Sequence, residues 1–248
     1  MHIPSYVVVP SNCPQKKVEA AKSYNASVFL SGTDPEDRVH LASQIQKTTG
    51  AILVPSADHV DIVLGQATVV RQFLQQVADL GEHLDAVIVP SGGGGLLVGA
   101  IAVCKAQGVT VLAAEPEHGG PGLASALLTG HRTLHLDGTP TIADGLRSLT
   151  GEHNWEHIKQ AGNVGEVFTV TEHQTKEALV LAIEELGCLI EPSAAVPLAA
   201  ALFTPAFAQR MCTLQRNARV GIVLTGANID VRELLEMAPG LDVGRIAG

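Results

Sequence analysis

The sequence predicts an α/β fold in which parallel sheets are covered by helices on both faces. Short apolar runs alternate with segments of helical spacing along most of the 248-residue chain. Several of these runs show no polar alternation, which is typical of parallel strands that are buried on both faces. Aromatic residues make up only 3% of the chain, so the core must consist mainly of Ala, Val, Leu and Ile.

A domain boundary is expected near Pro55-Ser56, which would leave a small α/β lobe, residues 1–55, and a larger lobe, residues 56–248. In the small lobe, Pro35 follows Thr33 and Asp34 and should start a helix that Gly50 ends. Prolines should also close two of its strands. The elements expected are strands at Ser5–Val9, Ser27–Leu30 and Ala51–Val54, and helices at Gln15–Tyr24 and from Pro35 to about Thr48.

The larger lobe repeats the alternation of strand and helix. Helices of about 10–15 residues between strands predict parallel pairing, because parallel neighbours need a crossover connection. The strands expected are Ala86–Val89, Val109–Ala114, Val167–Val170 and Arg219–Leu224, and the helices are Ile62 to about Leu80, Leu96–Gln107, Pro121–Leu128, Glu172–Leu186 and Ser193–Phe203.

Four consecutive glycines, Gly92, Gly93, Gly94 and Gly95, follow Ser91 between a predicted strand and a predicted helix. Their N–H groups can converge on a tetrahedral anion, and the helix N-terminus adds a favourable dipole. The lysine of a P-loop is absent, and the dinucleotide spacing G-x-G-x-x-G is not met. A compact monophosphate is therefore a better fit than a nucleotide polyphosphate.

Charge and composition argue against several classes of partner. The formal net charge is -9, whereas nucleic-acid binding needs clustered Lys and Arg. No apolar stretch approaches the roughly 18 residues that a membrane span requires. The N-terminal residues lack the pattern of a secretory signal, and the four cysteines lie far apart. We therefore expect a cytoplasmic protein that binds neither nucleic acid nor membrane.

Seven motifs occur in one order along the chain and together resemble the serine/threonine dehydratase and serine racemase family. Members of this family are pyridoxal-phosphate enzymes with the fold of the tryptophan synthase β chain. The matching motifs are Tyr6-Val7-Val8-Val9-Pro10, Gly65-Gln66-Ala67-Thr68, Val89-Pro90-Ser91 with the four glycines, Ala113-Ala114-Glu115-Pro116, Thr141-Ile142-Ala143-Asp144-Gly145, Ile190-Glu191-Pro192-Ser193 and Leu224-Thr225-Gly226-Ala227-Asn228.

The resemblance implies a two-lobed fold, pyridoxal 5'-phosphate as cofactor and an amino acid, serine or threonine, as substrate. Gly92, Gly93, Gly94 and Gly95 would hold the cofactor phosphate, and the Thr225 hydroxyl would lie near the pyridine nitrogen. The implied reaction is elimination of water and ammonia, which gives pyruvate or 2-oxobutanoate. Racemisation of serine is the alternative, because both reactions begin with loss of the same α-proton.

The resemblance also implies a metal ligand. Glu115 corresponds to a carboxylate that helps some family members bind Mg²⁺ or Ca²⁺, cations that prefer oxygen ligands. The family's second carboxylate falls near Pro121, which offers no side-chain ligand, so this prediction is weaker than that for the cofactor.

The chain departs from the family pattern at its N-terminus. The family's Schiff-base lysine and its Ser-x-Gly-Asn-His loop precede the Tyr6–Pro10 motif, and none of the seven lysines lies in a matching motif. The catalytic lysine is thus expected to be absent, with residues 1–55 a remnant of the small lobe. The expected explanations are an N-terminally truncated fragment of a dehydratase or a shortened, non-catalytic interaction module. The expected assembly is a homodimer or a pairing with a full-length homologue.

A rival interpretation concerns His153 and His157, whose i, i+4 spacing could place both imidazoles on one helical face as metal ligands. The zinc-protease pattern H-E-x-x-H fails, because Asn154 follows His153. Surface histidines are the simpler interpretation.

Overall fold

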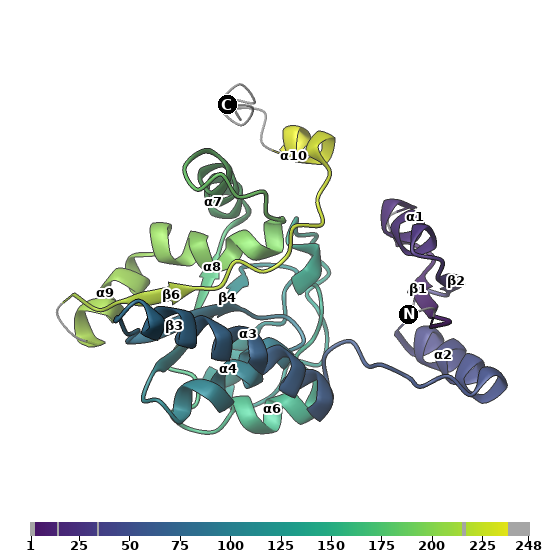
Figure 1. The fold of residues 1–248 in the computed structure, drawn as a ribbon, viewed down its shortest axis with the longest axis horizontal. Coiled ribbons are helices and arrows are strands. Elements are labelled where there is room, and N and C mark those ends of the chain that lie inside the picture. The colour runs from purple at the N-terminus through teal and green to yellow at the C-terminus, as the bar shows by residue number, and fades with distance from the viewer. Residues whose placement is uncertain (1–2, 14, 34, 215–216, 238–248) are drawn as a thin grey trace. The chain divides into compact units, whose positions relative to one another are not determined.

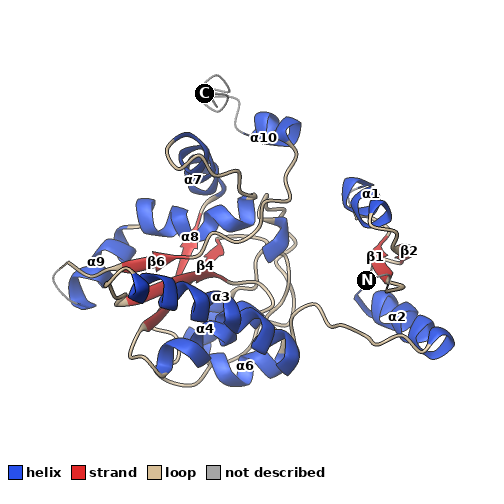
Figure 2. Ribbon diagram, in the orientation of Figure 1, coloured by secondary structure: helices blue, strands red, loops and turns tan. Residues whose placement is uncertain are grey.

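The chain forms two compact units, Met1–Pro55 and Ser56–Gly248. The computed structural model describes residues 3–13, 15–33, 35–214 and 217–237. In both units all paired strands run parallel, and helices flank them (Figure 2). The predicted α/β fold with parallel sheets is therefore confirmed.

The first unit is built on one parallel strand pair. β1 (Tyr6–Pro10) lies beside β2 (Ser27–Ser31), with Tyr6 opposite Ser27 and Pro10 opposite Ser31. Helix α1 (Gln15–Ser23) packs on β2, and α2 (Pro35–Thr49) packs mainly on β1.

The predicted strand at Ala51–Val54 is wrong. These residues have no regular secondary structure, and the side chains of Ile52 and Val54 are 89% and 73% exposed. A short apolar run between Gly50 and Pro55 has the composition of a strand. Composition does not make a strand without a partner to receive its backbone hydrogen bonds, and no described strand pairs with it.

The second unit contains a four-stranded sheet in the order β5-β4-β3-β6. Its central strand, β3 (Ala86–Pro90), is buried at every residue. The other strands are β4 (Thr110–Pro116), β5 (Glu166–Val170) and β6 (Val220–Ile222). The last is shorter than the predicted Arg219–Leu224.

Helices cover both faces of this sheet and create two cores (Figure 1). Val87 and Val89 of β3 pack toward α3 and α4, whereas Ile88 packs toward α7 and α8. The helices of the unit are α3 (Val60–Asp79), α4 (Gly95–Lys105), α5 (Leu123–Thr129), the 3₁₀ turn η1 (Asp144–Leu146), α6 (Glu152–Ile158), α7 (Glu172–Glu184), α8 (Pro192–Phe203), α9 (Pro205–Leu214) and α10 (Val231–Met237).

Three of these helices, α6, α9 and α10, were not expected from the sequence. Two of them have only seven residues each, which is too short for a hydrophobic period to stand out. Within the described ranges, none of the helices has the length and apolar character needed to cross a bilayer.

Two glycines on the packed pair α3 and α4 should respond oppositely to alanine. A Cβ on Gly65 of α3 would meet nothing within 4 Å, whereas one on Gly99 of α4 would lie 2.7 Å from the Ala67 backbone nitrogen. Gly65→Ala should raise the free energy of unfolding by about 0.5–1 kcal/mol through helix propensity. Gly99→Ala should lower it by about 1–3 kcal/mol through overpacking. Urea unfolding followed by circular dichroism measures both, and a neutral Gly99→Ala would contradict the close approach of the two helices.

Candidate functional site

The glycine loop joins the central strand β3 to helix α4 at the carboxyl edge of the sheet. The Ser91 backbone N–H donates to the Ala114 carbonyl at 2.8 Å, which ties the loop to the end of β4. Gly94 then adopts a φ of 92° immediately before the helix. L-residues with side chains rarely adopt this conformation, so the chain needs glycine at this position.

Crowding explains the other glycines of the loop. A Cβ on Gly93 would lie 2.6 Å from the Ala57 Cβ, and one on Gly95 would lie 3.0 Å from the Ala57 carbonyl oxygen. A Cβ on Gly92 would lie 3.0 Å from the Ser148 hydroxyl. The loop backbone is therefore held between neighbouring segments that leave no room for side chains.

A cavity of about 200 Å³ opens on this loop. All four glycines line it, together with Leu146 of η1, Glu191 and Ser193 at the start of α8, and Thr225 after β6. The structure thus brings together the two elements that the sequence assigned to the cofactor, although they lie more than a hundred residues apart. Parallel strands explain this, because their carboxyl ends meet at one edge of the sheet.

The loop presents backbone donors rather than charged side chains. Within the described ranges, the N–H groups of Gly92, Gly93 and Gly94 donate to no protein acceptor, and no Lys or Arg lines the cavity. The N-terminus of α4 adds its dipole at the same place. Such a set of converging donors is suited to an anion with several oxygens, such as a phosphate group.

The opposite side of the cavity is fixed by the start of α8. The Ser193 hydroxyl accepts a hydrogen bond from the Gly145 N–H at 2.9 Å and so holds η1 in place. The Glu191 N–H donates to the Gly226 carbonyl at 3.0 Å, and the Glu191 carboxylate accepts from the Asn228 N–H at 3.3 Å. Glu191 therefore positions the turn that carries Thr225.

Thr225 itself has an exposed side chain, and its hydroxyl makes no hydrogen bond to any described residue. A hydroxyl at this place can both donate and accept, and it carries no charge. It could therefore serve as a neutral hydrogen-bond partner for a ligand in the cavity.

Glu115, the predicted metal ligand, caps a helix. Its side chain is 1% exposed, and its two oxygens accept hydrogen bonds from the N–H groups of Leu123 and Ala124 at 2.7 and 2.8 Å, the first turn of α5. Burial raises the pKa of this carboxyl group, and the hydrogen bonds from the backbone oppose that rise.

The donor set around Glu115 gives a poor fit for Mg²⁺ or Ca²⁺, since both of its oxygens already serve α5. In the part of the chain that the structure describes, no three His, Cys, Asp or Glu side chains are placed to hold a metal ion. Metal binding by Glu115 stays a prediction from the resemblance, and no step below depends on it.

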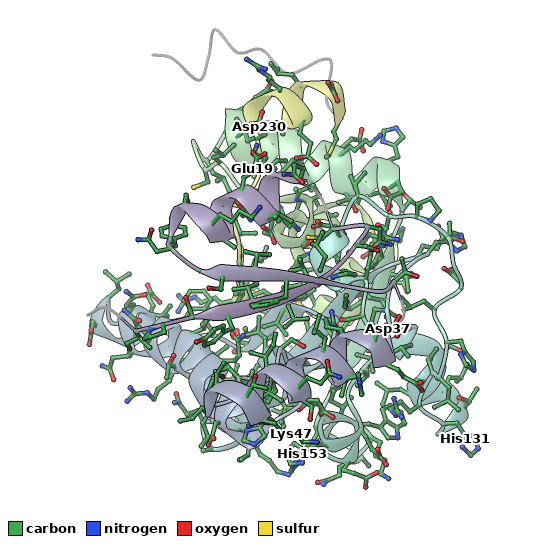
Figure 3. All side chains as sticks on the ribbon, turned by 90° about the vertical axis from the view of Figure 1, so that its right-hand side faces the viewer. Glu19, Asp37, Lys47, His131, His153 and Asp230 are labelled. Carbon is green, nitrogen blue, oxygen red and sulfur yellow. The ribbon has the colours of Figure 1, made fainter. Side chains whose placement is uncertain are left out.

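The histidine pair lies on α6, where the rings of His153 and His157 meet edge to face with centroids 5.1 Å apart. His153 is exposed on the outside of its unit (Figure 3). The metallohydrolase interpretation needs a third protein ligand, and the described residues supply none.

Sequence reasoning missed the residues behind the loop, Ala57, Asp58 and Asn154. Asn154 is fully buried, and its amide donates to the Gly93 carbonyl. One signal was available in the sequence. α6 begins after Gly151, which has no side chain to cap the helix, so a cap had to come from elsewhere in the chain.

Comparison with known proteins places this geometry in a family. Residues 1–226 match the family described as "Pyridoxal-phosphate dependent enzyme". The chain belongs to this family. The glycine cradle and its free N–H donors fit the phosphate group of the family's cofactor, and the cavity lies at the sheet edge where open α/β folds bind ligands.

Individual relatives narrow the resemblance. A protein of Oryza sativa subsp. indica named serine racemase is 34% identical over 236 residues, which span 94% of this chain and 67% of the relative. The structure of maize serine racemase gives a TM-score of 0.84 at 33% identity and covers 94% of this chain and 69% of its own. A structure of threonine deaminase from T.th. gives 0.80 at 31%, with 92% and 71% covered.

These relatives confirm the resemblance to the serine/threonine dehydratase and serine racemase family and the tryptophan synthase β-like fold. About a third of the rice relative's length has no counterpart in the 248 residues of this pyridoxal-phosphate family member.

Removing the Glu115 cap should destabilise the protein. Glu115→Ala leaves two N–H groups of α5 without acceptors, which should cost about 1–3 kcal/mol of unfolding free energy. Glu117→Ala is the matched control, because Glu117 is exposed two residues away and should change stability by less than about 0.5 kcal/mol. Urea unfolding of both variants tests the capping role. Equal stabilities would contradict it.

Proposed function

We propose that Gly92, Gly93, Gly94 and Gly95 hold the phosphate of pyridoxal 5'-phosphate and that the Thr225 hydroxyl faces its pyridine nitrogen. We further propose that the reaction served is elimination of water and ammonia from L-serine or L-threonine, giving pyruvate or 2-oxobutanoate. One observation supports this assignment above all: the loop and Thr225 line a single cavity at the carboxyl edge of the sheet.

Bound in this cavity, the cofactor would supply an electron sink for the charge that develops when the substrate loses its α-proton. The loop N–H groups and the dipole of α4 would bind the phosphate without a cationic side chain. Thr225 would offer the pyridine nitrogen a neutral hydroxyl, which does not hold a proton there as a carboxylate would. A weaker sink favours elimination, because departure of the substrate hydroxyl group relieves the charge at once.

Racemisation of serine is the second candidate. The rice and maize relatives are named serine racemase, whereas the T.th. structure is a threonine deaminase, so the relatives favour no single outcome. Both reactions need a lysine that holds the cofactor aldehyde and moves the α-proton. The described residues that line the cavity include no lysine. A shortened, non-catalytic binding module is therefore the third possibility that an experiment must separate.

The proposal is tested by titrating the full chain with pyridoxal phosphate and following its absorbance. Saturable binding is expected. Gly94→Ala should weaken it about tenfold or more, since a residue with a Cβ cannot keep the φ of 92° and the loop donors lose alignment. Gly108→Ala is the control, because Gly108 also has a positive φ but nothing within 4 Å of its Cβ position. Equal binding by all three proteins would contradict the assignment of the loop.

The same preparation separates the three functions. Ammonia and pyruvate from L-serine would support elimination, and D-serine would support racemisation. Cofactor binding with neither product would support the non-catalytic module.

A further inference from the structure

The back of the glycine loop is held by helix α6, on the side away from the cavity. The Asn154 side-chain amide donates to the Gly93 carbonyl at 2.8 Å and to the Ala57 carbonyl at 3.2 Å. The Gly151 N–H donates to the same Gly93 oxygen at 3.0 Å. No described residue of α6 lines the cavity. Two donors therefore fix one carbonyl of the loop from behind.

Fixing this carbonyl also fixes the donor that faces the other way. In a trans peptide unit the C=O and the next N–H point in opposite directions, and the described chain contains no cis peptide. With the Gly93 carbonyl directed at α6, the Gly94 N–H is directed away from α6, toward the cavity that Gly93 and Gly94 line. The Asn154 amide therefore sets the direction of one anion-binding donor.

Asn154 is in turn held by a carboxylate from outside its helix. Asp58 accepts hydrogen bonds from the N–H groups of Asn154 and His153 at 2.9 and 3.3 Å, so it caps α6 from 96 positions before Asn154 in the chain. A Cβ on Gly151 would lie 2.2 Å from the Asp58 Cγ, which shows how closely the carboxylate fits the helix start. Asp58 and α6 form a rigid support behind the loop.

We propose that Asn154 is a positioning residue for phosphate recognition: through the Gly93 carbonyl, it aims the Gly94 N–H at the phosphate of the ligand. This inference deepens the proposed function and rests on it. Asn154 does not touch the ligand. Its loss should therefore weaken affinity for the phosphate group selectively and leave contacts to the rest of the ligand intact.

A matched control lies close by in Asn163. It is also buried, at 8% exposure, and its amide donates to the His157 carbonyl at 2.8 Å, but it does not contact the loop. Replacing either asparagine removes a buried amide from the α6 region. Only replacement of Asn154 frees the Gly93 carbonyl from a side-chain donor.

The test compares affinities for pyridoxal phosphate and for pyridoxal, which lacks the phosphate. Full-length wild type, Asn154→Leu, Asn154→Asp and Asn163→Leu are measured by equilibrium dialysis. Asn154→Asp keeps the size of the side chain but turns an acceptor toward the Gly93 oxygen. We expect both Asn154 variants to lose about tenfold or more in affinity for pyridoxal phosphate, with pyridoxal binding unchanged. Asn163→Leu should keep the wild-type preference.

A wild-type preference for pyridoxal phosphate in both Asn154 variants would overturn the inference and leave the proposed function standing. Absence of that preference in the wild type would instead overturn the proposed role of the loop, and the inference with it. The two failures are thus seen in different proteins.

A second measurement uses the wild type and does not depend on how the variants fold. Only four glycines in the sequence follow another glycine: Gly93, Gly94, Gly95 and Gly120. Labelling with glycine that carries ¹³C at the carbonyl and ¹⁵N therefore limits an HNCO spectrum to these four amides. Addition of inorganic phosphate should move the Gly94 amide signal, with Gly120 as internal reference. A Gly94 signal that stays fixed at saturating phosphate would overturn the inference.

Discussion

The site depends on one constraint: a stretch of backbone without side chains is clamped between packed segments, so that its N–H groups face a cavity. Ala57 and Ser148 leave no space for a Cβ on Gly93 or Gly92, and Gly94 takes a conformation that other residues rarely adopt. No described Lys or Arg lines the cavity. Affinity for an anion therefore depends on the orientation of peptide groups, which only tertiary packing can fix.

The parallel sheet supplies the remaining parts of the site because the ends of its strands converge. The loop follows β3, Glu115 lies near the end of β4, and Thr225 follows β6. Each strand end is held by a different device. Glu115 caps α5, Glu191 secures the turn at Gly226, and the amide of Asn154 restrains the loop. The two cores on either face of the sheet keep these ends in register.

Much of this arrangement could be predicted from local sequence. Buried strands such as Ala86–Val89 and the run of four glycines carry their signals within a few residues. The resemblance of ordered motifs then indicated the family. Local signals failed where the cause was distant. Ala51–Val54 has strand composition but no described partner strand, and α6 depends on Asp58, 96 positions before Asn154. Glu115 was expected to bind metal because its position matches a ligand, whereas its hydrogen bonds to α5 became visible only in three dimensions.

A crystal structure of the chain with pyridoxal phosphate would test the central claim most directly. The account predicts phosphate oxygens within about 3 Å of the loop N–H groups, among them that of Gly94, with the Gly93 carbonyl still bonded to Asn154. It also predicts the Thr225 hydroxyl beside the pyridine nitrogen. A phosphate bound elsewhere, or one held mainly by Lys or Arg side chains, would contradict it.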